Sequence, residues 1–211
     1  MYQEYSRSEL IADGMIHAVG ICVALIGIAA MMTFAFSSSS PLTIASLAIY
    51  GAGVLLVFGC SAAYHMLPRS DWKQSLRRFD QAAISLKIAG TYTPFAVVKL
   101  GGLTGAVLLS SVWAIALFAA ALKLLGRQSR DALDIGLYLA LGWAGLAVFG
   151  PLSAAVTTQV LMLLALGGIL YSIGVVFHIW STLKYQNAIW HGFVLAGTCC
   201  HFGAVNAAVF S

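Results

Sequence analysis

The sequence predicts an all-α integral membrane protein with seven transmembrane helices, a cytoplasmic N-terminus and an external C-terminus. Three observations lead to this fold class: an apolar composition, a series of long apolar runs, and a one-sided distribution of lysine and arginine. Residues 1–211 are expected to form a single transmembrane domain, because no linker separates one run from the next.

The composition is typical of a membrane protein. Of the 211 residues, 61% are hydrophobic and 9% are charged, whereas soluble domains carry about 25% charged residues. So apolar a chain cannot cover a surface that faces water. The net charge of +4 comes without a long basic tail or charge block, so we expect no nucleic-acid partner.

Seven apolar runs are long enough to cross a bilayer, which needs about 20 residues of helix. Turn-forming segments such as SSSSP, PRSD, GRQSRD and GP separate them. Strands are not expected, because the runs are continuous and a backbone in lipid must satisfy its own hydrogen bonds. The expected helices cover residues 12–34, 43–67, 79–99, 103–124, 132–150, 156–181 and 188–209.

Lysine and arginine gather on one side of the predicted membrane. With the N-terminus inside, the cytoplasmic segments hold nine of these residues and the external segments hold only Lys99. This asymmetry satisfies the positive-inside rule and sets the predicted orientation. Consequently the helices over 43–67 and 156–181 end at the cytoplasmic face, and those over 79–99 and 188–209 begin there.

Histidine and acidic side chains recur at one depth, near the cytoplasmic face. Five of the expected helices contribute them: Asp13 and His17, Ser61 and His65, Asp80, His178, and His191. Asp13 and His17 lie four residues apart, as do Ser61 and His65, so each pair shares one helix face. The sequence therefore predicts that these side chains converge.

Several imidazoles and a carboxylate in a low-dielectric bundle have the composition of a zinc site. Bound zinc would bring the pKa of a water ligand to about 7, and Asp80 would orient that water or accept its proton. A simpler role is open for each residue alone. A single intramembrane histidine is more often a hydrogen-bonded packing residue, and Asp80 alone fits a charge favoured by the helix dipole. The shared depth is what favours a metal.

Three sequence blocks carry a family resemblance. They are "SAAYH" at 61–65, "LRRFDQAAISLKIAGTYTPF" at 76–95 and "NAIWHGFVLAGTCCHFGAV" at 187–205, and "HAVG" at 17–20 fits with them. They resemble the signature blocks of the bacterial hemolysin III family. That family is the prokaryotic branch of the progestin and adipoQ receptor superfamily and a relative of the alkaline ceramidases.

The resemblance implies a seven-helix protein of the bacterial inner membrane, with Zn²⁺ near the cytoplasmic leaflet. His65 and His191 match two zinc ligands of the superfamily, and Ser61 and Asp80 match the polar residues that surround the metal and carry any catalysis. The pattern places a third ligand at position 187, where this chain has Asn187, a poor zinc ligand.

The identity of the third zinc ligand is therefore open. His178 is the first choice, because the short turn between the last two expected helices puts residues 178 and 191 at similar depth. His17, Asp80 and a second water are the alternatives.

Two functions of different classes are consistent with this pattern. The resemblance favours a non-enzymatic membrane-homeostasis protein, acting in lipid or energy balance or as a cytolytic or channel-like protein, with membrane lipids or a lipid-like ligand as partners. The alternative is a zinc-dependent intramembrane hydrolase of lipid amides or esters, similar to a ceramidase. Asn187 in place of a ligand favours the first.

Lys87 is a second unusual feature, because it lies about 12 Å inside the helix expected over 79–99. At that depth it should face the bundle interior or a wet cavity. It is expected either to pair with Asp134 or Asp13, or to contact a lipid headgroup or an ion path.

Overall fold

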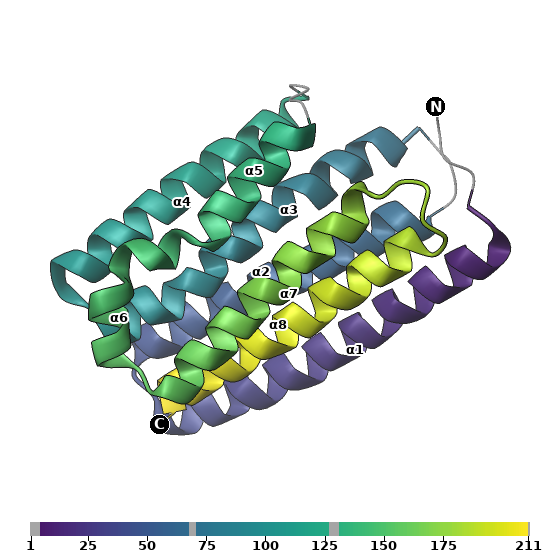
Figure 1. Cartoon of the computed structure of the whole chain (residues 1–211). Coiled ribbons are helices and arrows are strands. Elements are labelled where there is room, and N and C mark those ends of the chain that lie inside the picture. Colours follow the sequence, from purple (N-terminus) through teal and green to yellow (C-terminus); the bar gives the residue numbers. More distant parts are fainter. Residues whose placement is uncertain (1–4, 68–70, 127–130, 211) are drawn as a thin grey trace.

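The computed structural model describes residues 5–67, 71–126 and 131–210, and shows long helices packed side by side (Figure 1). No strand occurs among these residues, so the all-helical class is confirmed. In chain order the helices are α1 (Arg7–Ser38), α2 (Pro41–Met66), α3 (Lys73–Pro94), the π-helical η1 (Phe95–Leu100), α4 (Gly102–Leu124), α5 (Asp131–Gly142), the 3₁₀ helix η2 (Ala144–Val148), α6 (Phe149–Ala155), α7 (Thr158–Ile179) and α8 (Gln186–Phe210).

Six helical stretches of the described chain are long and apolar enough to cross a membrane, so the protein is a multi-pass membrane protein. They are Arg7–Ser38, Pro41–Met66, Gly102–Leu124, Ala132–Ala155, Thr158–Ile179 and Gln186–Phe210. The remaining long helix, α3, is not among them, because its first turns carry Arg77, Arg78 and Asp80. The seventh span and the orientation of the termini stay predictions.

The helix expected over 132–150 is not continuous. The chain leaves α-helical geometry after Gly142, passes through η2, and resumes as α6. Tyr92 of α3 holds this break: its hydroxyl donates to the Gly142 carbonyl at 2.7 Å and accepts from the Gly145 N–H at 2.9 Å. The boundary expected at Gly150–Pro151 is therefore wrong, because Pro151 lies in the first turn of α6, where a proline is tolerated.

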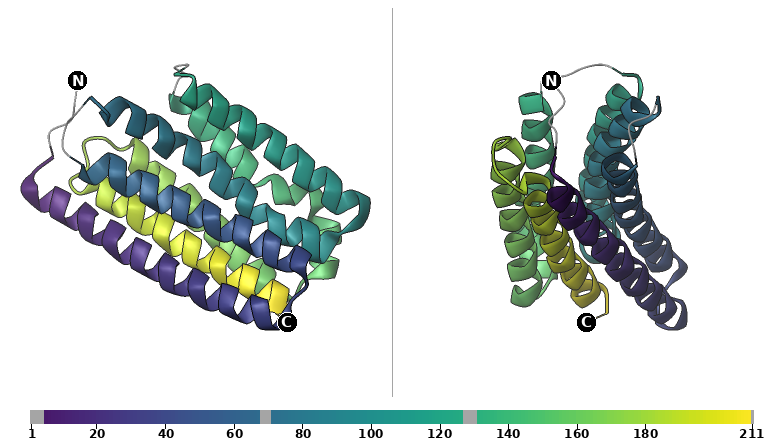
Figure 2. Two further views of the ribbon diagram at one scale, coloured as in Figure 1. Left: turned by 180° about the vertical axis from the view of Figure 1, so that it is seen from behind. Right: turned by 90° about the vertical axis from the view of Figure 1, so that its right-hand side faces the viewer.

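Helix α1 runs along both α2 and α8, which places the start of α1, the end of α2 and the start of α8 at one end of the bundle. Figure 2 (left) shows these three helices side by side. The start of α1 is capped by Ser6, whose side chain accepts from the Glu9 N–H. The Glu9 carboxylate in turn accepts from the Tyr185 N–H at 3.0 Å, just before α8. This contact ties α1 to α8 where the polar residues lie.

Helices α2 and α3 approach each other closely through glycine. A Cβ added at Gly53 would lie 3.2 Å from the Lys87 Cα, and one added at Gly90 would lie 3.3 Å from the Ile49 carbonyl oxygen. Small residues at such contacts let helix backbones approach in a membrane. The contact also places Lys87 level with the middle of α2.

Candidate metal centre

The Asp13 carboxylate lies at the centre of a buried polar cluster. Asp13 itself is 3% exposed. Its Oδ1 is 2.6 Å from the Nδ1 of His191 and 3.6 Å from the Nδ1 of His17. Its Oδ2 is 3.6 Å from the Nδ1 of His65. Helices α1, α2 and α8 thus bring three imidazoles to one carboxylate.

The hydrogen bonds fix the tautomers of two of these rings. The backbone carbonyl of Asp13 can only accept, so the His17 Nδ1, 2.9 Å away, carries the proton. The His191 Nδ1 likewise donates to the Asp13 carboxylate. In the neutral rings the Nε2 atoms of His17 and His191 therefore carry lone pairs.

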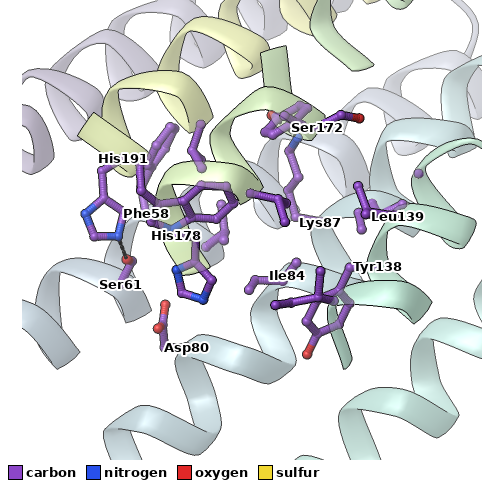
Figure 3. Close-up of a pocket in the computed structure, with 18 of the residues that line it drawn as sticks. Phe58, Ser61, Asp80, Ile84, Lys87, Tyr138, Leu139, Ser172, His178 and His191 are labelled. Atoms are coloured by element: carbon purple, nitrogen blue, oxygen red, sulfur yellow. Dashed lines mark hydrogen bonds between the residues drawn. The ribbon is translucent and has the colours of Figure 1, made fainter. Parts of the chain in front are cut away.

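Both lone pairs approach the same hydroxyl. The Oγ of Ser61 lies 3.2 Å from the Nε2 of His17 and 3.5 Å from the Nε2 of His191, and Figure 3 shows the second of these contacts. A hydroxyl has one proton, so it can satisfy only one of them. The Ser61 side chain also interacts with the Asp80 carboxylate. At least one imidazole lone pair is therefore available to another donor or to a metal cation, which imidazole nitrogen binds readily.

The ring packing is equally tight. The His191 ring centroid lies 4.4 Å from that of His17 and 4.6 Å from that of His65. Among the described residues, Asp13, His17 and His191 offer ligand atoms that all lie within 4.8 Å of one another, so this group could hold a metal ion. We call Asp13, His17, Ser61, His65 and His191 the histidine cluster.

A carboxylate that accepts from one ring nitrogen while the other faces a metal is a common arrangement in zinc sites. Asp13 and His191 have this arrangement, since the Asp13 Oδ1 accepts from the His191 Nδ1 and the His191 Nε2 faces Ser61. The residues present therefore fit a zinc ion with His191 and His17 as ligands. His65, whose side chain is 18% exposed, lies beside them as a further imidazole.

Of the residues expected at the site, His65, His191 and Ser61 are brought together. Figure 3 shows the Asp80 carboxylate pointing into the space between Ser61 and the His178 ring. His178 lies outside the group of three ligand residues, with its ring 5.0 Å from that of Trp190. Its role as third ligand, like the roles of Asp80 and Ser61, stays a prediction.

Helix α1 supplies the centre of the cluster. Asp13 and His17 were expected to converge with the other polar residues, and His17 was an alternative third ligand, but Asp13 was not expected to contact all three imidazoles. The four-residue spacing of Asp13 and His17 in the sequence was the available signal. The spacing does not show that the carboxylate of Asp13 reaches two other helices.

Asn187 takes no part in the group of ligand residues. Asn187 is half-buried and lies beside Tyr5, which precedes α1 in the chain. Burial raises the pKa of the Tyr5 hydroxyl, and a hydrogen bond with the Asn187 side chain opposes that rise. Position 187 therefore contacts the N-terminal segment through a polar amide.

The histidine cluster forms part of the wall of a cavity of about 1650 Å³. The cavity continues past Asp80 and Lys87 between α3, α5 and α7 (Figure 3). Beyond Lys87 its lining is mostly apolar and includes Ile88, Phe95, Phe149, Leu152, Leu161 and Leu164. A polar end and a long apolar body suit an amphiphilic ligand.

Neither carboxylate expected to pair with Lys87 does so. Asp134 forms a buried ion pair with Lys123, and Asp13 is surrounded by histidines. Lys87 instead donates a hydrogen bond to the Tyr171 hydroxyl. It lines the cavity, as expected from its depth.

Comparison with known proteins shows which family has a similar sequence. The family model described as "Haemolysin-III related" matches residues 6–202. The chain is 35% identical over 201 residues to the Hemolysin-3 homolog of Bacillus subtilis (strain 168), which covers 95% of this chain and 94% of that protein. Hemolysin-3 of Bacillus cereus is 30% identical over 197 residues, covering 93% and 90%.

A human protein is also similar. Monocyte to macrophage differentiation factor of Homo sapiens is 26% identical over 166 residues, covering 74% of this chain and 67% of that protein. These matches confirm the resemblance carried by the sequence blocks. The chain therefore belongs to the haemolysin-III-related family.

Proposed function

We propose that the chain is a seven-helix protein of the bacterial inner membrane that binds zinc at the cytoplasmic leaflet and holds a membrane lipid or lipid-like ligand. Its role would be in membrane homeostasis. One observation carries the proposal: the buried histidine cluster forms one end of a large, mostly apolar cavity. At 1650 Å³ the cavity exceeds the usual range of small-molecule sites, which is about 300–1,000 Å³.

The basic residues beside the cluster support the proposed orientation. Lys73 and Arg77 line the same cavity, at the start of α3. An excess of such residues is typical of cytoplasmic segments, which supports a cytoplasmic position for the cluster. The name of the Bacillus cereus relative, Hemolysin-3, keeps a cytolytic activity within the proposal.

His17, His65 and His191 would hold the zinc, and Asp13 would orient His191. When bound, zinc would supply a Lewis acid and structural cross-linking between α1, α2 and α8. Ser61, which lines the cavity, would then donate its proton to a ligand bound beside the metal.

Lipid occupancy of the cavity tests the proposal. Ala165 of α7 lines the cavity, so Ala165→Phe should fill part of it and reduce the bound lipid per protein severalfold. The measurement is mass spectrometry of lipids extracted from detergent-purified protein. Ala106→Phe is the matched control, because Ala106 is exposed on α4 and does not line the cavity. Equal lipid content in both variants and the wild type would contradict a lipid site.

A lipid amide or ester hydrolase is the second candidate. One observation favours it: Asp80 and Ser61 face the same space beside the histidine cluster (Figure 3). Asp80 would accept a proton from an attacking water, and Ser61 would hydrogen-bond to the developing oxyanion. The cavity beyond would hold the acyl chain.

Zinc-dependent release of fatty acid from a ceramide or phospholipid would distinguish the hydrolase. Asp80→Asn should then lower turnover by about 10²–10⁴-fold, the usual contribution of a general base. Asp71→Asn serves as control, since Asp71 is exposed and does not line the cavity. Lipid binding with no acyl release from any lipid class would leave the non-enzymatic role.

A further inference from the structure

Lys87 lies level with the middle of α2, a helix that is long and apolar enough to cross a membrane. Its Cα packs against Gly53, which lies halfway along α2. Helix α2 has 26 residues, which span about 39 Å, enough to cross a hydrocarbon core of about 30 Å. Lys87 is 6% exposed, too deep to reach the headgroup region by extending its side chain.

Among the residues that the structure describes, the Lys87 ammonium has one hydrogen-bond acceptor, the Tyr171 hydroxyl. Thr198 donates to the Val194 carbonyl at 2.8 Å, so the Tyr171 hydroxyl, 2.6 Å from the Thr198 Oγ1, donates to Thr198. The Tyr171 oxygen is then free to accept from Lys87. An ammonium has three N–H donors, and this chain of bonds uses one.

No anion of the described residues balances the charge of Lys87. Within residues 5–67, 71–126 and 131–210, no carboxylate forms an ion pair with Lys87. The other contact is the Tyr171 ring, whose centroid lies 4.3 Å from Nζ. An unpaired ammonium in the hydrocarbon core is unfavourable, and such residues usually pair or mark a ligand path.

The residues around the two remaining N–H donors of Lys87 indicate what kind of ligand would bind them. Lys87 lines the cavity, and Figure 3 shows its side chain extending away from Asp80 and His191. Along α3 and into η1 the cavity wall runs from Asp80 through Lys87 to Phe95, so Lys87 lies between the polar end and the apolar body. A ligand with one acidic group at Lys87 and a long apolar chain would fit this lining.

From this geometry we propose that Lys87 binds the carboxylate of a long-chain fatty acid. A single ammonium with two free donors matches a group of charge −1 with two oxygens. A phosphate of higher charge would need further cations, and no other lysine or arginine of the described residues lines this part of the cavity. Tyr171 orients the ammonium, and the apolar wall holds the chain. The inference rests on the cavity being a lipid site, as proposed above.

The test compares two ligands that differ only in the head. Oleate and oleyl alcohol are bound to delipidated protein in non-ionic detergent at pH 8, with the wild type, Lys87→Met and Lys99→Met. Oleate should bind the wild type about tenfold or more tightly than it binds Lys87→Met, the loss expected when a charge-assisted bond is removed. Lys99→Met, a lysine outside the cavity in η1, should bind oleate as the wild type does.

Oleyl alcohol separates this inference from the lipid site itself. It should bind the wild type and Lys87→Met equally. Equal binding of oleate to all three proteins would overturn the role of Lys87 and leave a hydrated lysine in a lipid cavity. Failure of both ligands to bind the wild type would overturn the lipid site as well.

A phosphate arm and a second variant complete the experiment. Tighter binding of oleoyl-lysophosphatidic acid than of oleate, lost in Lys87→Met, would overturn the carboxylate assignment. Tyr171→Phe keeps the ammonium but removes the hydroxyl acceptor, and should weaken oleate binding less than Lys87→Met does. An unchanged elution volume and zinc content in Lys87→Met would show that the fold and the metal site are intact.

Discussion

Detergent-purified protein should carry about one zinc per chain, and His191→Ala should lose it. His191 is the ring that contacts all the others: it bonds to Asp13, approaches Ser61, and packs between His17 and His65. Removing it takes one of the ligand atoms that lie within 4.8 Å of one another. The site would then keep two groups of that set, too few for a stable zinc site. Elemental analysis of the purified protein measures this directly.

Two further histidine variants make the result specific. His201→Ala is the control. His201 lies on α8, as His191 does, but its side chain bonds to the Leu164 carbonyl of α7, away from the cluster. This variant should keep its zinc. His178→Ala decides the third ligand: loss of zinc would add His178 to the site, and retention would leave His17 and His65 to complete it. Wild-type protein without metal would reduce the cluster to a hydrogen-bonded polar core.

The helices were predictable because their signals are local. Long apolar runs, turn-forming segments and one-sided basic residues predict spans one at a time, and the six membrane-capable stretches of the described chain agree with them. The break between α5 and α6 was not predicted, because it depends on a contact made elsewhere. Tyr92 of α3 satisfies the backbone at Gly142 and Gly145, and nothing near residue 142 in the sequence shows this.

Most residues of the site were predictable from the sequence, but the central position of Asp13 was not. Ser61, His65 and His191 were expected from depth and from the family blocks, and they do lie together. The contacts of Asp13 with three histidines could not be derived from the sequence. A helical repeat shows only on which face of its own helix a side chain lies. Which neighbouring helix meets that face depends on how α1 packs between α2 and α8. For the same reason the depth of Lys87 was predicted correctly, but its hydrogen-bond partner Tyr171, on another helix, was not.

Asn187 stands at the position where the family resemblance implies a zinc ligand. Position 187 lies beside Tyr5 and points to the segment before α1. The same helix α1 then supplies Asp13 and His17 to the cluster. In the proposed zinc site, groups of α1 would replace the ligand missing from the start of α8, and the contact between Glu9 and Tyr185 holds α1 beside that point.

Asp13→Asn should weaken zinc binding by about 10–100-fold without unfolding the protein, the usual cost of removing a carboxylate that orients a metal-bound histidine. Asparagine has the same shape and can still accept from the His191 Nδ1, so the ring keeps its place. It has no charge, so it makes the imidazole a weaker donor to the metal. Zinc affinity, measured by competition with a chelator at fixed pH, reports the change.

The size of that loss distinguishes three roles for Asp13. Complete loss of zinc, as in His191→Ala, would make Asp13 a direct ligand, which its place in the group of three allows. A loss of about 10–100-fold would make it the residue that orients His191. Affinity equal to that of the control Asp71→Asn, an exposed carboxylate outside the cavity, would place the metal away from Asp13. The zinc would then be held at the Nε2 side of the rings by histidines alone, and Asp13 would serve only to pack α1 against α2 and α8.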